Sequence, residues 1–168
     1  MIKFCFYGPE STGKTEMAKR MAAHYQTELV PEVAREMITS NDFTLADIIQ
    51  IGEEQTKCVQ EKLKSANKFL FCDTDLITTQ IYSQQYLHEV PPRLTELENQ
   101  IQYDMYFLFD IDVPWVPDGL RDLGDRRIEM ATIFKSELEK RGIPYVLISG
   151  NWEERFERIK TEVDKFLK

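Results

Sequence analysis

Eight consecutive residues near the start of the chain have the types and spacing of a phosphate-binding loop. Residues 8–15 read Gly-Pro-Glu-Ser-Thr-Gly-Lys-Thr, which satisfies the pattern G-x-x-x-x-G-K-[ST]. The apolar run Ile2–Tyr7 precedes this loop and an amphipathic stretch follows it, so the loop joins a strand to a helix. Backbone N–H groups and the positive end of that helix form an anion site. The loop therefore predicts that the chain binds a nucleoside triphosphate.

The side chains of this loop indicate how the triphosphate and its metal ion are held. Lys14 is expected to reach the β- and γ-phosphates, and the Thr15 hydroxyl is placed to hold Mg²⁺. The predicted triphosphate-binding residues of the loop are Gly8, Glu10, Ser11, Thr12, Gly13, Lys14 and Thr15.

A second chemical signal is an acidic residue at the end of an apolar strand. The run Phe69–Cys72 is followed by Asp73, Thr74 and Asp75. Beside a phosphate loop, a carboxylate in this position holds Mg²⁺ or its water shell, so we expect Asp73 on the metal side. Asp75 is equally well explained as the cap of the following helix.

The polar segment 110–127 carries three arginines and two glycines. We expect Arg121, Arg126 and Arg127 to form a lid that donates hydrogen bonds to the transferring phosphoryl group and excludes water. A solvated surface loop of mixed charge is the alternative. The neighbouring sequence Pro-Trp-Val-Pro at 114–117 argues against that alternative, because a purely solvated loop does not require such a cluster.

Polar residues also follow the last predicted strand. The Gly turn before Asn151 is a place where an adenine ring could lie against backbone and the face of Trp152 or Arg155, so Asn151, Trp152 and Arg155 are candidate nucleotide-binding residues. Packing at the start of the next helix explains Trp152 and Arg155 equally well.

The remaining candidates lie where a phosphate acceptor would meet the triphosphate. Glu32, Arg35 and Glu36 follow directly on the carboxyl end of the strand Glu28–Val30. Gln55 is a lone amide on a helix face that is otherwise rich in apolar residues. A buried Gln needs hydrogen-bond partners, and a ligand amide or base is one candidate. On pattern alone, Gln55 is expected to be an ordinary boundary residue.

Five short apolar runs predict strands that are buried on both faces of a parallel sheet. They are Ile2–Tyr7, Glu28–Val30, Phe69–Cys72, Met105–Phe109 and Tyr145–Ile148. Helical patterns lie between them, including a long helix capped near Thr44 and a last helix capped by Asn151 with Glu154. This alternation predicts an α/β fold: a three-layer α/β/α sandwich with a five-stranded, mostly parallel sheet and ligands at the carboxyl ends of the strands.

Composition limits the classes of protein that this chain can belong to. Its 168 residues suit one domain, residues 1–168, with the lid at about 110–127. A net charge of −8 argues against a general nucleic-acid binder. Three cysteines without a C-x-x-C pair fit a reducing cytoplasm. We see no signal peptide and no membrane span, and the sequence does not set the oligomeric state.

Taken together, these motifs resemble the ribosylnicotinamide kinase domain of the NadR type, a branch of the P-loop nucleoside and nucleotide kinases. The matching segments occur in order and cover nearly the whole chain. They are GPESTGKT (8–15), PEVARE (31–36), DF…GEEQ (42–55), DTDLITTQ (73–80), VPWVPDGLRDLGDRR (113–127) and GNWEERF (150–156). The phosphate loop is generic, whereas DTD-x-ITTQ and PW-x-x-DGLR are much more specific.

The resemblance implies transfer of the ATP γ-phosphate to the 5′-hydroxyl of nicotinamide riboside, which gives nicotinamide mononucleotide. Lys14 and Thr15 would hold ATP and Mg²⁺, and Asp73 would sit by the metal and the attacking hydroxyl. Asp73 is the first candidate to accept the hydroxyl proton, and Glu32 is the second. The arginines 121, 126 and 127 would clamp the phosphates. The implied acceptor-binding residues are Glu32, Arg35, Glu36, Gln55, Asp75, Trp115 and Asp118.

The chain departs from the multidomain members of that family. A nucleotidyltransferase would need an H-x-G-H-type site, whereas the only histidines are His24 and His88. We therefore predict neither adenylyl transfer nor DNA binding. Two other interpretations stay open: a kinase for another nucleoside or nucleotide, and an NTP-binding regulatory ATPase.

Overall fold

The computed structural model describes residues 1–38, 40, 42–114 and 126–168. Within these ranges, five strands form one sheet in the order β2-β3-β1-β4-β5, and every neighbouring pair is parallel. The strands are β1 (Ile2–Tyr7), β2 (Glu28–Val30), β3 (Phe69–Asp73), β4 (Met105–Phe109) and β5 (Tyr145–Ile148). The prediction of a mostly parallel sheet is confirmed, and the described strands are parallel throughout. β3 extends one residue beyond its predicted end, so that Asp73 belongs to the strand.

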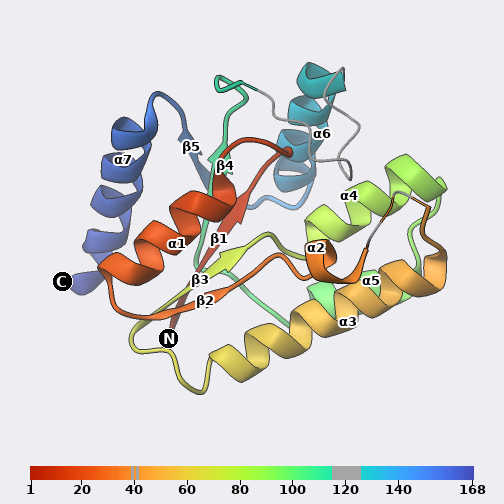
Figure 1. Ribbon diagram of the computed structural model, residues 1–168, viewed down its shortest axis with the longest axis horizontal. Helices are drawn as coiled ribbons and strands as arrows, with labels where there is room; N and C mark the ends of the chain where they lie inside the picture. The colour runs from red at the N-terminus through yellow and green to blue at the C-terminus, as the bar shows by residue number, and fades with distance from the viewer. Residues whose placement is uncertain (39, 41, 115–125) are drawn as a thin grey trace.

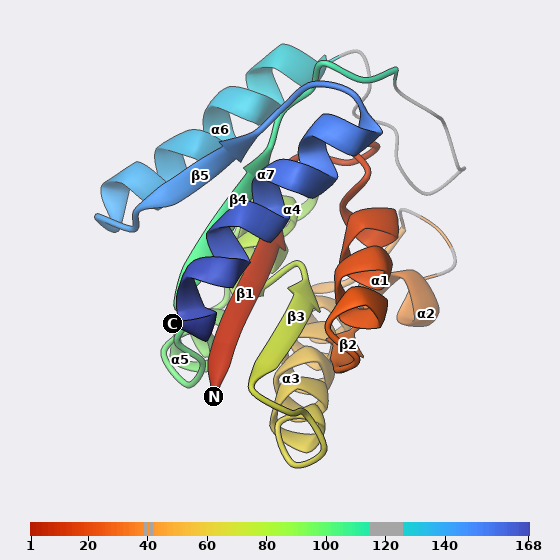
Figure 2. The ribbon, with the colours of Figure 1, turned by 90° about the vertical axis from the view of Figure 1, so that its left-hand side faces the viewer.

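Helices cover both faces of the sheet, as the predicted three-layer fold requires (Figures 1 and 2). One face carries α1 (Lys14–His24) and α7 (Trp152–Asp164), whose side chains pack on a row of strand phenylalanines. The other carries α3 (Leu45–Lys62), α4 (Leu76–Leu87) and α6 (Arg127–Lys140). Alternation along β1 explains both contacts, because Phe4 and Phe6 point to the first face while Cys5 and Tyr7 point to the second.

A smaller apolar cluster joins the helices on the second face. α5 (Pro92–Glu98) packs with α3 and α4 through buried aliphatic side chains. Gly52 makes this close packing possible, because a Cβ there would lie 2.8 Å from a Leu94 methyl carbon. The short helix α2 (Ala34–Met37) also lies against α3, and a 3-10 turn, η2 (Lys165–Leu167), ends the chain. Of these helices, α2, α3 and α4 contribute residues to the candidate site.

Strand order brings the chemical segments together at one edge of the sheet. β1 lies between β3 and β4, and the register pairs Phe6 with Asp73. The phosphate loop and Asp73 therefore meet at the carboxyl ends of adjacent strands, where this class of sheet binds its ligands.

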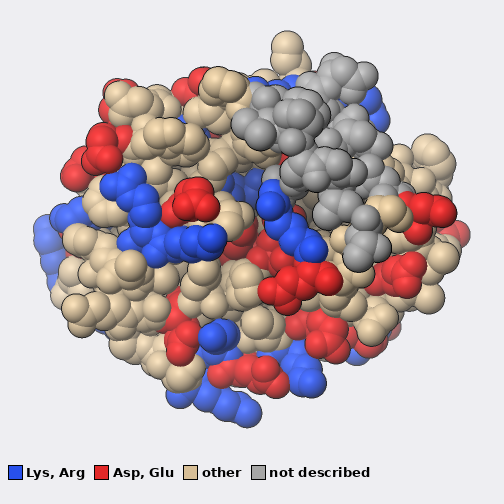
Figure 3. Space-filling view, in the orientation of Figure 1, with Lys and Arg blue, Asp and Glu red and all other residues tan. Residues whose placement is uncertain are grey.

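The described surface has a mixed charge pattern. On the face in Figure 3, Lys and Arg side chains are interspersed with Asp and Glu. Among the described helices, none combines the length and apolar character needed to cross a bilayer.

Candidate functional site

The backbone of the phosphate loop adopts conformations that require its glycines. Gly8 and Gly13 have φ of 140° and 86°, in the region that favours glycine. A Cβ on Gly8 would lie 2.8 Å from the Phe109 carbonyl oxygen, and one on Gly13 would lie 2.3 Å from a Trp152 ring carbon. Ser11 also has a positive φ of 57°. The two glycines of the motif therefore let the loop pass closely between β4 and the start of α7.

Lys14 lies across the mouth of this loop. Its side chain is buried, and Nζ donates hydrogen bonds to the Pro9 carbonyl at 2.7 Å and to the Thr12 hydroxyl at 3.5 Å. The Thr12 hydroxyl also donates to Pro9. The ammonium group is thus held over the loop at the N-terminus of α1, where unpaired N–H groups and the helix dipole favour an anion.

Thr15 and Asp73 form the second half of the phosphate site. The Thr15 hydroxyl donates to Asp73 Oδ2 at 2.6 Å, and Asp73 is 1% exposed. These hard oxygen atoms beside a phosphate loop fit Mg²⁺, which takes one or two protein oxygens and keeps waters and phosphates as its other ligands. In the described ranges no group of three or more His, Cys, Asp or Glu forms a metal cage. The donor set therefore suits a metal ion that arrives with the nucleotide.

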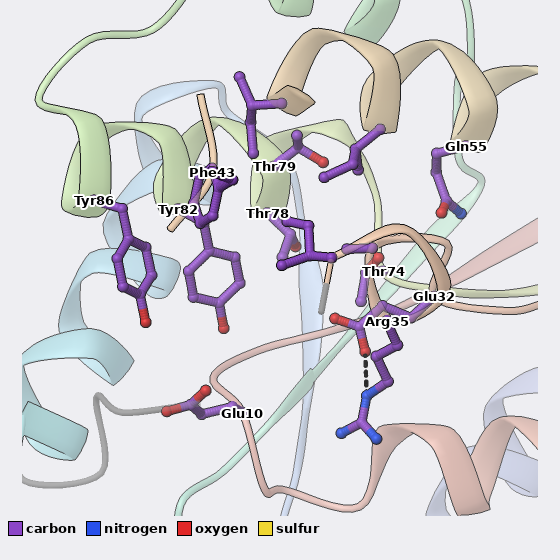
Figure 4. Close-up of a pocket in the computed structure, with 14 residues that line it drawn as sticks. Glu10, Glu32, Arg35, Phe43, Gln55, Thr74, Thr78, Thr79, Tyr82 and Tyr86 are labelled. Atoms are coloured by element: carbon purple, nitrogen blue, oxygen red, sulfur yellow. Dashed lines mark hydrogen bonds and ion pairs between the residues drawn. The ribbon is translucent and has the colours of Figure 1, made fainter. Parts of the chain in front are cut away.

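A pocket opens beside the phosphate loop on the side of α3 and α4 (Figure 4). It encloses about 730 Å³, including its open mouth. Its lining residues come from the phosphate loop, the segment after β2, the residues just before α3 and just after β3, and helices α3 and α4. They are Glu10, Glu32, Ala34, Arg35, Ile38, Phe43, Ile48, Ile51, Gln55, Thr74, Thr78, Thr79, Tyr82 and Tyr86. Glu10 belongs to both the phosphate loop and the pocket wall, so the two sites are contiguous.

Aromatic rings form one wall of this pocket. Tyr82 and Tyr86 project from α4 with ring centroids 6.3 Å apart, and Phe43 meets the Tyr86 ring edge-on at 5.4 Å. Figure 4 shows both tyrosine hydroxyls on the side of the pocket at which Glu10 lies. This wall offers ring faces and edges to a planar ligand next to a carboxylate.

The opposite wall carries an ion pair and a buried amide. Glu32 accepts from Arg35 Nε at 3.2 Å; its side chain is 13% exposed, while that of Arg35 is 44% exposed. Gln55 is 2% exposed and accepts from the Val33 N–H at 3.0 Å. The expectation that Gln55 is a boundary residue is therefore wrong, because the segment after β2 folds over this turn of α3 and buries it.

Thr74 has strained backbone at the point where the two sites join. Its φ is 76°, which is uncommon for a residue with a branched side chain, and its N–H donates to the Phe6 carbonyl. Thr74 follows Asp73 directly and lines the pocket. The strain thus occurs where the chain passes from the metal side of the site to the acceptor side.

The structure does not bring Asp75 into the pocket lining. Its carboxylate is 1% exposed and caps α4, accepting from the Thr78 N–H and hydroxyl, while Tyr106 donates to its other oxygen at 2.7 Å. Burial raises the pKa of this carboxyl group, and the bonds from Thr78 and Tyr106 oppose that shift. The helix-cap alternative accounts for Asp75, whose carboxylate is bonded to the pocket-lining residue Thr78.

Two other predicted ligand residues also lie elsewhere. Glu36 is exposed on α2 and does not line the pocket. Asn151 caps α7, with its side chain accepting from the Glu154 N–H while Glu154 accepts from the Asn151 N–H. This capping box is confirmed, and a contact of Asn151 with the nucleotide stays a prediction.

Arg155 is a buried structural side chain rather than a platform for adenine. It is 0% exposed, and its guanidinium donates to the carbonyls of Gly150 at 2.8 Å and Thr12 at 3.3 Å. It also pairs with the Asp112 carboxylate. Trp152 differs, because its ring covers Gly13 and the residue remains 48% exposed. Arg155 therefore serves in packing at the start of the helix, which was one of its two predicted roles. Trp152 still exposes part of its surface to solvent beside the loop.

Arg126 and Arg127 point to different parts of the molecule. Arg127 Nη2 donates to the Ser11 carbonyl at 3.1 Å, so this guanidinium lies against the phosphate loop. Burial lowers the pKa of Arg127, a shift that Asp112 opposes. Arg126 instead binds Glu129 on its own helix and Gln85 on α4. Of the other predicted residues, Trp115, Asp118 and Arg121 lie outside the described residues.

Several pocket residues were not anticipated from the sequence. Thr78, Tyr82 and Tyr86 recur at intervals of four along α4 and so share one helix face, and Phe43 precedes the cap of α3. That fourfold spacing is the signal that could have revealed them. It is hard to see because the first half of α4 is buried on nearly all sides, so the pocket face does not differ in polarity from the core face.

Comparisons with known proteins agree with the motifs. The AAA domain family matches residues 3–155. A curated relative, the trifunctional NAD biosynthesis/regulator protein NadR of Escherichia coli (strain K12), is 30% identical over 160 residues. That match covers 90% of this chain and 39% of the relative, so the chain spans about two fifths of the relative's length. The similarity to NadR that the motifs indicated is confirmed.

Solved structures share the fold. NadR protein in complex with NR has a TM-score of 0.85 at 20% identity, covering 97% of this chain and 51% of that one. NadR in complex with NAD and AMP-PNP has a TM-score of 0.84 at 19% identity, covering 98% and 49%. Deoxyadenosine kinase from M. mycoides has a TM-score of 0.72 at 11% identity, covering 98% and 100%. The predicted P-loop kinase fold is confirmed.

Proposed function

The chain belongs to the AAA domain family, and on that premise we propose that it is an ATP-dependent kinase that phosphorylates the 5′-hydroxyl of nicotinamide riboside. The observation that carries this proposal is a pocket with both aromatic and acidic walls that opens directly beside the phosphate loop. The two sites share Glu10, so an acceptor in the pocket would face the terminal phosphate of a nucleotide held by the loop.

The phosphate side of the site supports ATP as the donor. Lys14 would leave the Pro9 carbonyl, to which it is bonded, and bind the phosphates as they enter the loop. Mg²⁺ bound with the nucleotide would neutralise charge on the phosphates, with Thr15 and Asp73 as its protein contacts. Arg127 would add positive charge beside the loop. NadR, with which this chain shares its fold, has been solved with AMP-PNP.

The acceptor side favours a cationic aromatic base. A pyridinium ring carries a permanent positive charge, and the faces of Phe43, Tyr82 and Tyr86 attract such a charge through their ring electrons. Glu10 and Glu32 add two carboxylates to the same pocket, and Arg35 is paired with Glu32 there. This combination supports nicotinamide riboside over a neutral nucleoside, and NadR has been solved in complex with NR.

The reaction would transfer one phosphoryl group and one proton. The 5′-oxygen of the acceptor bonds to the γ-phosphorus as the bond to the oxygen between the β- and γ-phosphorus atoms breaks, and ADP leaves. The hydroxyl proton passes to a carboxylate. Glu32 lines the acceptor pocket, whereas Asp73 receives the Thr15 hydroxyl bond and lies outside the lining. The geometry therefore favours Glu32 as the proton acceptor and Asp73 as the metal contact.

A panel of nucleosides tests the proposal. ADP release would be followed with nicotinamide riboside, adenosine, cytidine, deoxyadenosine and thymidine as acceptors. We expect kcat/KM for nicotinamide riboside to exceed that for each neutral nucleoside by at least about tenfold. Preference for a neutral nucleoside would replace the proposed substrate, and ADP release that no acceptor stimulates would indicate a regulatory ATPase.

A further inference from the structure

Among the described residues, the amide oxygen of Gln55 has a hydrogen-bond partner, whereas its amide nitrogen has none. Its Oε1 accepts from the Val33 N–H at 3.0 Å, which fixes the orientation of the amide and turns Nε2 the other way. In the described part of the chain, Nε2 is buried and has no hydrogen-bond partner. The residue as a whole is 2% exposed.

A buried donor without a partner is costly in this position. Leaving such a group unsatisfied costs about 1–3 kcal/mol, so proteins seldom retain one without a use. The next residue along α3 illustrates the ordinary case, because Thr56 is 3% exposed and its hydroxyl donates to the Gly52 carbonyl at 2.8 Å. Gln55 lines the pocket and Thr56 does not.

The environment of Gln55 restricts what can satisfy it. Figure 4 shows the Gln55 side chain reaching from α3 toward the side of the pocket at which Glu32 is labelled, with the amide oxygen nearer the other labelled residues and the nitrogen beyond it in this view. Ile51, one turn earlier on the same helix, lines the pocket beside it. Nε2 can only donate, so the ligand must present an acceptor atom there, in surroundings that strengthen a hydrogen bond by excluding water.

We propose that Gln55 Nε2 donates to a carbonyl oxygen carried by the base of the acceptor nucleoside, which makes Gln55 a specificity-determining residue. This inference rests on the proposed function and deepens it. The aromatic and acidic walls select a cationic ring but do not distinguish one substituent on that ring from another. The amide does, because a ring without a carbonyl group would enter the pocket and leave Nε2 unpaired. Nicotinamide riboside carries the required oxygen in its carboxamide group.

The experiment compares two ligands that differ only in that group: nicotinamide riboside and the riboside of unsubstituted pyridine. Both are cations, so effects of charge cancel in the ratio of their kcat/KM values. The wild-type protein is expected to prefer nicotinamide riboside by about 10–100-fold, which corresponds to one satisfied buried donor. Dissociation constants for both ribosides are measured in parallel.

Two variants of Gln55 locate the source of the preference. Gln55→Glu keeps an oxygen for the Val33 N–H but loses the amide donor, and Gln55→Met has no donor at any pH. The preference is expected to fall at least about tenfold in both. Thr56→Val is the matched control, because it removes a buried polar group from the same helix outside the pocket. It should leave the ratio within about twofold of wild type.

The outcomes separate this inference from the proposed function. A wild-type ratio near one overturns the role of Gln55 without any variant, and so does a ratio that Gln55→Glu and Gln55→Met leave unchanged in folded protein. If neither riboside is phosphorylated but both bind with the expected preference, the proposed function fails and the role of Gln55 stands. If neither riboside binds, both are overturned.

Discussion

At the scale of single residues, Arg127 is an arginine of the predicted lid that the described structure brings to the phosphate loop. Its guanidinium donates to the Ser11 carbonyl at 3.1 Å, whereas Arg126, its neighbour in the chain, is bonded to Glu129 and Gln85. Arg127 therefore supports the shape of the loop and places positive charge where the triphosphate would lie. The sequence suggested a phosphate role for both arginines and could not rank them, because adjacent residues diverge at a helix start.

Arg127→Ala is expected to lower kcat/KM for ATP at least about tenfold, because it removes a fixed positive donor beside the phosphates. Arg126→Ala serves as the matched control and should reduce kcat/KM less than about threefold, since the exposed Glu129 and the half-buried Gln85 hold its guanidinium. Steady-state kinetics with nicotinamide riboside held at saturation would measure both. The opposite ranking of the two variants would show that the phosphate role belongs to Arg126.

At the scale of elements, the sequence predicted the strands well and the pocket only in part. Five continuous apolar runs marked the strands, and the capping patterns at Thr44 and Asn151 marked two helix starts. The phosphate loop and Asp73 followed from the order of strand, loop and helix. The pocket wall on α4 could not be predicted in this way, because tyrosines such as Tyr82 and Tyr86 occur both in cores and in binding sites.

Asp75 illustrates the limit of local patterns. Its position beside Asp73 indicated a ligand contact, but the bond that Tyr106 donates to its carboxylate depends on β4 lying next to β1. Gln55 is the opposite case: its pattern indicated a boundary residue, but the segment after β2 covers α3 and buries it. Both environments come from long-range packing, which the spacing of residues along the chain does not contain.

The junction of α7, β4 and the phosphate loop depends on Arg155. Arg155→Met should lower the free energy of unfolding by about 3 kcal/mol, because the Asp112 carboxylate and the Thr12 and Gly150 carbonyls lose their common donor. Arg158→Met, on the same helix with a side chain 55% exposed, is the control and should cost less than about 1 kcal/mol. Urea unfolding at equilibrium measures both. A loss below about 1 kcal/mol for Arg155→Met would contradict the role given to this residue.

At the scale of the whole molecule, the charge distribution matches the proposed pair of substrates. The chain carries a net charge of −8, which opposes a triphosphate and attracts a cationic nucleoside. At the phosphate loop this repulsion is offset, because Lys14 and Arg127 lie there beside the positive end of α1. The acceptor pocket keeps Glu10 and Glu32 and lies on the other side of that loop. Under the proposed function, the pocket would take the cationic acceptor next to the loop that takes the phosphates, and a phosphoryl group would move across their shared boundary.

The central claim is tested most directly by following the fate of the transferred phosphate. Phosphorus NMR of the protein with ATP, Mg²⁺ and nicotinamide riboside would record which molecule gains it. We expect one 5′-phosphate of nicotinamide mononucleotide for each ADP formed, and neither product with Lys14→Ala. Formation of ADP together with inorganic phosphate, while the riboside stays unphosphorylated, would contradict the account.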